Sequence, residues 1–263
     1  MKHLSFSFET SVTFDEPVTE HAFVLRCLPV SAGPQTVKSY LSLEPQCSYA
    51  LQQDSFGNRL AVGRIAEEHS QFSYQSYGFA SVDATKAWRD EAHPMYRFAS
   101  PLATPDAQLR SWVEGLGLER GADGALSQAG CIALMHAVNA HMAYEPHSTD
   151  VGTSASQAFA QARGVCQDFA HVLVAAFRAC GMAARYVSGL TLGEGETHAW
   201  VHVHVGGTWL ALDPTCDCLA GEDYIVCTWG RDWADCPIER GTMHGQTDQQ
   251  QRVLVHVEEQ ASA

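Results

Sequence analysis

The chain has 263 residues, enough for one large domain or two small ones, and 46% of them are apolar, the balance of a globular protein. Its 16 basic and 30 acidic residues give a formal net charge of −14, and no Lys/Arg cluster offers a footprint for a phosphate backbone. This composition argues against nucleic acid and anionic membrane as partners, and the excess of acidic residues is interpreted as a solvated surface.

Neither a membrane span nor a secretory leader is predicted. No stretch approaches about 20 consecutive apolar residues, and the start, MKHLSFSFET, lacks the apolar segment of a signal peptide. The nine cysteines are an odd number scattered through apolar segments, unlike the even framework of a small secreted disulfide domain. We therefore expect a cytoplasmic protein whose cysteines are mostly reduced packing residues.

The first third of the chain has the pattern of strands. From residue 3 to about residue 84, short alternating runs such as LSFSF, TVKSYLSL and FSYQSY are separated by the turn-forming DEP, SAGP and DSFGN. We predict an antiparallel β domain over residues 1–100, with Gly57–Asn58 in a hairpin loop. No acid–base cluster occurs in it, which favours a structural or substrate-positioning role. The proline-containing residues 86–106 are predicted to be a surface connection.

After this connection the apolar spacing becomes helical, and we assign residues 101–263 to a second, catalytic domain. Helices are expected over AQLRSWVEGLG, from Leu126 to Tyr144, and over SASQAFAQA, which Gly164 would end. After a further helix come the strand-like runs AARYVSGLT, HAWVHVHV and TWLALDP, and both YIVCTW and RVLVHVE could add strands. Helices followed by strands predict an α+β fold.

One cysteine lies where the backbone favours its thiolate. From Cys166 to Cys180 apolar residues recur at intervals of three and four, and Gly181 stands where a helix-ending residue is needed. Cys166 therefore opens a buried helix, whose positive dipole end and unpaired N–H groups favour thiolate over thiol. The other eight cysteines lack this placement. Asp168, in the same first turn, is expected to be a dipole partner or structural acceptor and not a catalyst.

The Gly206–Gly207 pair predicts a hairpin that brings a histidine close to a carboxylate. With a two-residue turn, His198 and Asp213 become diagonal neighbours on one face, while an unbroken apolar set occupies the other face. A carboxylate at this place can fix the imidazole tautomer and stabilise the imidazolium that forms when His198 takes a thiol proton. The alternative for Asp213 is a turn aspartate before Pro214.

The blocks GVCQDFAHVLVAAFRACGMAARYVSG, THAWVHV and WLALDPT, in this order, resemble the transglutaminase-like superfamily. Together with the β-rich start and the late GRDWADCPIERGTMHG, they resemble bacterial members of it that are assigned as cysteine proteases. The resemblance covers nearly the whole chain. It implies a papain-like, transglutaminase-like core, in which a central helix packs on an antiparallel sheet, with Cys166 as nucleophile, His198 as base and Asp213 as its orienter.

Stabilisation of the oxyanion is expected first from the backbone N–H of Cys166. Tyr144, whose position in AYEP resembles a recurring tyrosine of the family, is the choice for a side-chain donor. The alternative for Tyr144 is a core tyrosine at the end of a helix. The mechanism needs no cofactor and no metal ion.

These residues predict cysteine-dependent acyl transfer on the amide bonds of a peptide, protein or small amide substrate. Hydrolysis is favoured over transamidation, because the resemblance is to members of protease-like assignment and the chain has no recognisable calcium loop. Transglutaminase-type transfer to an amine, and a non-catalytic binding protein on the same fold, stay open as alternatives. The sequence determines neither the substrate, nor the acyl acceptor, nor the oligomeric state.

A zinc-binding hydrolase or module is the alternative from another class. His198, His202 and His204 share a strand face, and Cys216 and Cys218 follow the facing strand. The spacing is neither Cys-x-x-Cys nor His-Glu-x-x-His, and the side chains of such a ladder spread over more than about 10 Å. The cysteine triad is therefore preferred, and the last four of these residues receive no function.

Overall fold

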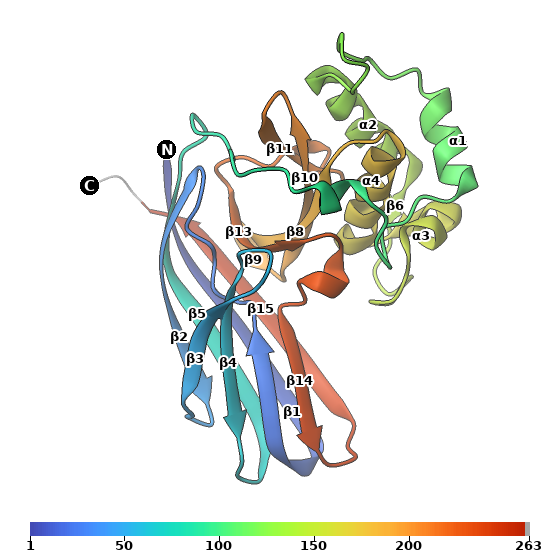
Figure 1. Ribbon diagram of the computed structural model, residues 1–263. Coiled ribbons are helices and arrows are strands. Elements are labelled where there is room, and N and C mark those ends of the chain that lie inside the picture. Colours follow the sequence, from blue (N-terminus) through green and yellow to red (C-terminus); the bar gives the residue numbers. More distant parts are fainter. Residues whose placement is uncertain (261–263) are drawn as a thin grey trace.

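The protein folds into two antiparallel sheets and four α-helices within residues 1–260, the part of the chain that this computed structural model describes. Figure 1 shows the helices gathered at one end of the molecule, the larger sheet extending away at the other end, and the smaller sheet between them. This arrangement confirms the predicted α+β class, with an antiparallel β region beside a core of helices on a sheet.

The larger sheet has eight strands and is built around the first of them. They are β1 (Lys2–Leu25), β2 (Gln35–Glu44), β3 (Tyr49–Gln53), β4 (Arg59–Ile65), β5 (His69–Val82), β9 (Gly193–Gly195), β14 (Glu239–His244) and β15 (Gln249–Glu259). The first half of β1 pairs with β5 and β15, and its second half pairs with β4 and β14. Apolar residues at alternate positions of β1 are buried, which is why this segment forms a strand with one face in the core. The predicted hairpin at Gly57–Asn58 joins β3 to β4.

Two strands from the end of the chain belong to this larger sheet. β15 runs antiparallel to β1 from Leu4 to Phe14, and β14 pairs with the second half of β1. The larger sheet therefore contains strands from both segments that the sequence assigns to separate domains, 1–100 and 101–263. The strand expected at RVLVHVE is part of β15.

The smaller sheet carries the hairpin and has five strands in the order β12-β11-β10-β8-β13. They are β8 (Ala184–Thr191), β10 (His198–Val205), β11 (Thr208–Asp213), β12 (Cys218–Leu219) and β13 (Tyr224–Gly230). Helix α4 (Cys166–Ala179) packs on one face of this sheet, where Val201, Val203 and Leu212 contact its apolar residues. This is the apolar hairpin face that the sequence predicts.

Three further helices surround α4 on the side away from the sheet. They are α1 (Ala107–Gly115), α2 (Gln128–His141) and α3 (Ala155–Gln161), and the short strands β6 (Ala143–Tyr144) and β7 (Arg163–Gly164) pair in parallel beside them. The expectation that Gly164 ends α3 is wrong. The helix ends because Ala162 turns into the left-handed region at φ 53°, and Gly164 lies in β7 instead.

The connection predicted to run over the surface is partly buried. It includes a short 3-10 turn, Pro94–Arg97, and its side chains Trp88 and Tyr96 pack under the smaller sheet with Trp200 and Trp209. The Trp209 N–H donates to the Trp88 carbonyl, which ties the connection to β11. The hairpin face that carries His198 is consequently covered by an aromatic layer, and both faces of the smaller sheet are packed.

Candidate functional site

The start of α4 is held by a buried carboxylate. Asp168 accepts hydrogen bonds at Oδ2 from the Val165 N–H at 2.8 Å and from the Thr149 hydroxyl at 2.6 Å. Burial raises the pKa of Asp168, and these two donors partly offset that effect. Asp168 is thus the structural acceptor that the sequence predicts. Gly164 is required beside it, since a Cβ at this position would lie 2.5 Å from the Asp168 side chain.

Cys166 occupies the first position of α4, where backbone N–H groups are free of hydrogen bonds. The N–H groups of Asp168 and Phe169 both donate to the Val165 carbonyl, at 2.9 and 3.1 Å. Within residues 1–260, the N–H groups of Cys166 and Gln167 have no hydrogen-bond acceptor. Free N–H groups and the positive end of a 14-residue helix favour negative charge at this point, on a thiolate or on an oxyanion.

The Gly-Gly hairpin has the predicted register. Val201 pairs with Leu212 and Val205 pairs with Thr208, so the turn contains two residues. Gly206 and Gly207 both have positive φ, at 60° and 81°, which favours glycine in such a turn. His198 Nε2 consequently lies 2.7 Å from Asp213 Oδ2. The predicted contact between this histidine and this carboxylate is confirmed.

Asp213 is fully buried and anchored on both oxygens. Its Oδ1 accepts hydrogen bonds from the N–H groups of Thr215 and Cys216, at 2.9 and 3.1 Å, and its Oδ2 accepts from the Tyr224 hydroxyl at 2.8 Å. Burial acts to raise the pKa of Asp213, but His198 and these donors outweigh it and the pKa is lowered. Asp213 therefore holds the turn after β11 and stays ionised beside His198, and its role as the orienter of His198 stays a prediction.

The imidazole of His198 contacts a carboxylate and shares a pocket with the thiol of Cys166. Burial acts to lower its pKa, but the hydrogen bonds and charges of Asp213 and Cys166 outweigh burial and raise the pKa to about 10. Because Nε2 is bonded to Asp213, Nδ1 is the atom left for Cys166. The indole of Trp200 stacks on the imidazole, with ring centroids 6.2 Å apart, and limits its rotation.

Cys166 and His198 open into a pocket of about 260 Å³. One part of its lining comes from the elements around α4 and the smaller sheet, including Gln167 and Trp233. The other part comes from the larger sheet, through Phe8, Thr10 and other residues of β1, β5, β14 and β15. The site thus lies where the two sheets meet.

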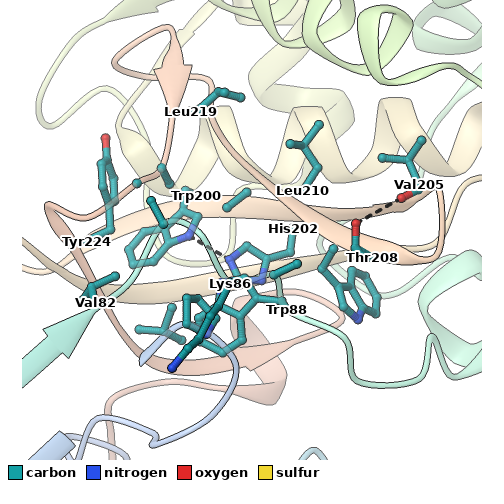
Figure 2. A pocket seen from close by; sticks show the side chains of 18 of the residues that line it. Val82, Lys86, Trp88, Trp200, His202, Val205, Thr208, Leu210, Leu219 and Tyr224 are labelled. Carbon is teal, nitrogen blue, oxygen red and sulfur yellow. Dashed lines mark hydrogen bonds between the residues drawn. The ribbon is translucent and has the colours of Figure 1, made fainter. Parts of the chain in front are cut away.

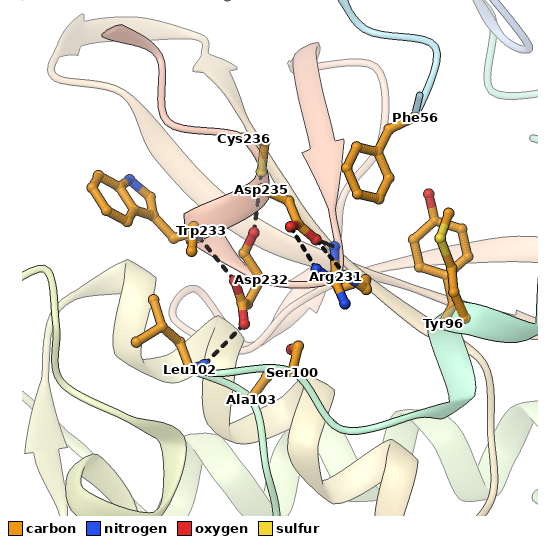
Figure 3. A network of polar contacts seen from close by, with 12 residues as sticks. Phe56, Tyr96, Ser100, Leu102, Ala103, Arg231, Asp232, Trp233, Asp235 and Cys236 are labelled. Carbon is orange, nitrogen blue, oxygen red and sulfur yellow. Dashed lines mark hydrogen bonds and ion pairs between the residues drawn. The ribbon is translucent and has the colours of Figure 1, made fainter. Parts of the chain in front are cut away.

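The loop after β13 contains GRDWADCPI, which the sequence left without a role. Figure 3 shows its polar contacts: Arg231 pairs with Asp235, and Asp232 accepts the N–H group of Leu102, from another segment. Asp232 also accepts the N–H group of Ala234. The carbonyl of Arg231 accepts a hydrogen bond at 2.6 Å from the buried guanidinium of Arg178, in α4. This loop therefore fastens α4 and places Trp233 in the lining of the pocket.

Tyr144 is the predicted side-chain donor for the oxyanion. It lies near Cys166 in the structure, but its side chain is exposed. It pairs in β6 with Gly164, two residues before Cys166, and 58% of its surface is accessible. Burial raises its pKa, and the neighbouring Cys166 adds to the effect. Tyr144 is not among the residues that line the pocket of Cys166 and His198. Its role in oxyanion binding stays a prediction.

The other histidines of the strand are separated from His198. His202 is fully buried, and both of its ring nitrogens face donors, from Arg185 and Trp200, each at 3.2 Å. Figure 2 shows His202 and Trp200 in the lining of an aromatic pocket of about 330 Å³ beneath the sheet. His204 packs edge-on against Trp209. The three histidines of β10, His198, His202 and His204, therefore have separate surroundings and do not form one cluster.

Within residues 1–260, one group of three side chains has potential metal ligands within 4.8 Å of each other: His198, Asp213 and Cys216. Two of these are the predicted base and its orienter. Burial raises the pKa of Cys216 to about 12, and the charge of Asp213 adds to this, so the thiol is protonated at neutral pH. Cys218 contacts the Tyr224 hydroxyl at 3.3 Å instead. Of the five residues of the zinc alternative, His198 and Cys216 belong to this group, whereas His202, His204 and Cys218 do not.

Sequence reasoning missed the residues that surround the triad. Tyr224 supports Asp213 from β13, and the lining residues Thr10, Tyr74 and Glu239 come from strands far away in the chain. Their local patterns are those of ordinary strands, so no motif identified them. Only the pairing of β1 with the end of the chain brings them to Cys166.

No helix within residues 1–260 combines the length and the apolar character needed to cross a membrane. All nine cysteines are free thiols.

Two family models match the chain. Residues 118–214 match the transglutaminase-like superfamily, and residues 4–80 match the bacterial transglutaminase-like N-terminal region. Among curated proteins, an uncharacterized protein of Mycobacterium tuberculosis is 39% identical over 117 residues, 38% of this chain and 37% of the relative. One from Mycobacterium leprae is 38% identical over 124 residues, 43% of this chain and 44% of the relative. The chain thus spans less than half the length of these relatives.

Among solved structures, a cysteine protease candidate from Cytophaga hutchinsonii superimposes with a TM-score of 0.81. The match covers 100% of this chain and 92% of that one, at 18% sequence identity. A likeness at this identity shows that the two proteins share the whole fold, including the larger sheet.

Proposed function

This chain belongs to the transglutaminase-like superfamily, and from that premise we propose that it is a cysteine-dependent enzyme that hydrolyses amide or peptide bonds. The observation that carries the proposal is the contact of His198 with Asp213, at 2.7 Å, in the same pocket as Cys166 at the start of α4. A thiol, an oriented imidazole and free N–H groups beside one pocket are what acyl transfer through a cysteine requires.

In the acylation step, the sulfur of Cys166, paired with the His198 imidazolium, attacks the carbonyl carbon of the substrate. The oxyanion that forms is placed at the start of α4, where the N–H groups of Cys166 and Gln167 are free. As the C–N bond breaks, the His198 imidazolium gives its proton to the leaving amine. The acyl group stays on Cys166 as a thioester.

In the deacylation step, a water molecule attacks the thioester while His198 takes one of its protons. The C–S bond breaks, a carboxylic acid leaves, and His198 keeps the proton that it took from water, which restores the starting pair. Asp213 keeps the ring in the required orientation during both steps and stabilises its charged form. An amine in place of water would give transamidation, the alternative outcome.

The nucleophile can be tested without knowledge of the substrate. We expect iodoacetamide near neutral pH to alkylate Cys166 faster than the other eight cysteines, as measured by peptide mapping against time. The control is Cys180, which is half-buried at the other end of α4 and whose pKa is raised by burial. Alkylation of Cys166 no faster than that of Cys180 would contradict the proposal.

The reaction can then be tested with a library of peptides and small amides. We expect wild-type protein to release acid and amine and Cys166→Ala to release neither, as measured by mass spectrometry. Addition of a primary amine separates the two acceptors, because hydrolysis gives the free acid and transamidation gives the new amide. Equal turnover by wild type and Cys166→Ala would rule out the cysteine mechanism.

Cytoplasmic location is a further proposal, which rests on the free thiols and the scattered cysteines. Cell fractionation with an antibody to the native protein tests it, and recovery in an oxidising compartment would contradict it.

A further inference from the structure

Polar side chains of the larger sheet line one wall of the pocket that contains Cys166 and His198. Three neighbouring strands, β5, β1 and β15, bring Tyr74, Thr10 and Val253 into one row, since Thr10 pairs with both other residues. All three line the pocket that contains Cys166 and His198, and so does Glu239 at the start of β14. None of these residues has a task in the acyl-transfer mechanism.

Two buried hydroxyls in this wall lack a well-formed hydrogen bond. Thr10 is completely buried and Tyr74 is 2% exposed, and neither hydroxyl has a partner with good hydrogen-bond geometry within residues 1–260, although Tyr74 lies near Thr10 and Glu239. Buried polar groups in native proteins are nearly always hydrogen-bonded, so an orphan group that lines a pocket indicates a missing partner. Burial and the nearby Glu239 raise the pKa of Tyr74, which keeps its hydroxyl neutral.

Glu239 brings a carboxyl group to the same wall. One of its oxygens accepts a hydrogen bond from Gln251 at 3.2 Å, and within residues 1–260 no cation pairs with this group. Burial raises the pKa of Glu239, while the nearby Tyr74 hydroxyl partly offsets this. A half-buried carboxylate without a cation is costly unless a bound group supplies the charge.

We propose that Glu239, Tyr74 and Thr10 form a subsite for a substrate ammonium group on an apolar stem, such as a lysine side chain beside the scissile amide. An ammonium has three N–H donors, and these residues offer a carboxylate and two hydroxyl oxygens. Phe8, Ile238 and Val253 line the same pocket and can pack against the methylenes of the stem.

The size of the pocket agrees with this occupant. Its volume of about 260 Å³ lies below the usual range of roughly 300–1,000 Å³ for pockets that enclose whole ligands. It therefore suits one side chain of a larger substrate. The inference rests on the proposed function, since it places the lysine beside the bond that Cys166 attacks.

The test compares two peptides that differ at one position, lysine or its uncharged analogue norleucine. Their dissociation constants are measured by titration calorimetry on the Cys166→Ala protein, and kcat/KM is measured on protein with Cys166 intact. We expect the lysine peptide to be preferred at least ten-fold in both measurements, and Glu239→Gln to bring the ratio close to one. Tyr74→Phe, which keeps the ring and removes one acceptor, should lower the ratio several-fold.

Glu9→Gln is the matched control, because Glu9 precedes Thr10 in β1 and points to the opposite face of the sheet. The ratio should not change in this variant. Near-UV circular dichroism reports whether each variant is folded, and Tyr74→Phe decides the question if Glu239→Gln does not fold.

The two proposals fail in different ways. Equal dissociation constants for the two peptides, or a lysine preference that survives Glu239→Gln and Tyr74→Phe, would overturn the subsite whatever the activity. A lysine preference that depends on Glu239, in a wild-type protein that turns over neither peptide, would support the subsite and count against the proposed function.

Discussion

Single residues set the charge of the site, and His198 shows how. Its ordinary pKa is about 6.5, and burial alone would lower it. Asp213 and Cys166 raise it to about 10, so the imidazolium persists through neutral pH. A protonated His198 can give its proton to the leaving amine, and that ability is lost as the pH rises through about 10.

This charge balance predicts an alkaline limb in the pH profile of kcat/KM. We expect the limb near pH 10 in wild type and at lower pH in Asp213→Asn, because loss of the carboxylate charge lowers the pKa of His198. The rate at pH 8 should fall by about 10²–10⁴. Asp217→Asn is the control, since Asp217 pairs with His136 on the surface. A limb that does not move in Asp213→Asn would contradict this role.

Among the elements, α4 depends on the residues just before it. Gly164 allows Asp168 to reach back to the Val165 N–H, and that contact sets where the helix begins. Because the helix begins there, Cys166 occupies the first helical position. The other end of α4 is fastened by Arg178, which donates to carbonyls of three separate segments, at Tyr96, Ala184 and Arg231.

Gly164→Ala should therefore change the position of Cys166 and lower its reactivity. The new Cβ would meet Asp168 at 2.5 Å, so we expect a loss of about 1–3 kcal/mol in the free energy of unfolding. Alkylation of Cys166 by iodoacetamide should slow by about ten-fold. Gly195→Ala is the control, because no atom lies within 4 Å of its added Cβ. Unchanged alkylation in folded Gly164→Ala protein would show that this contact does not position Cys166.

Arg178→Lys should destabilise the whole catalytic region. Arg178 is 5% exposed, and a lysine has too few donors for its acceptors and leaves a buried charge poorly paired. We expect a loss of about 3–5 kcal/mol in urea unfolding. Arg110→Lys, on the exposed face of α1, should change the stability by less than about 0.5 kcal/mol. Similar stabilities of the two variants would contradict this account.

For the whole molecule, the decisive feature is that the two ends of the chain share one sheet. β1 pairs with β15 over the segment whose side chains also line the catalytic pocket. Thr10 and Tyr74 reach the pocket from the larger sheet, whereas Cys166 and His198 come from the helices and the smaller sheet. Loss of the first 100 residues would leave β14 and β15 without β1.

We therefore expect a fragment of residues 101–263 to lack native tertiary structure. Its near-UV circular dichroism should be weak and its Cys166 should not be alkylated faster than its other cysteines. Co-expression with residues 1–100 should restore both properties, because the missing strand pairs can form again. A fragment with native circular dichroism would show instead that the second segment folds alone.

Much of the fold and of the triad could be predicted from local pattern. The limits of α4, the two-residue hairpin turn and the contact of His198 with Asp213 follow from periodicity and glycine positions within about 50 residues of sequence. One local expectation was wrong, because Ala162 and not Gly164 ends α3. The connection over residues 86–106 is mostly exposed, as expected, but its side chains Trp88 and Tyr96 are buried against aromatic residues of the smaller sheet.

The α+β class and the grouping of Cys166, His198 and Asp213 could be predicted from the sequence alone, since helix and hairpin geometry relate residues that are near in the chain. The residues that surround these three depend on the tertiary structure. Tyr224 behind Asp213 and Glu239 in the pocket wall depend on strand pairings between distant segments. Strand patterns specify which face of a strand is buried but not which strand it pairs with, so these neighbours emerge only when the sheets form.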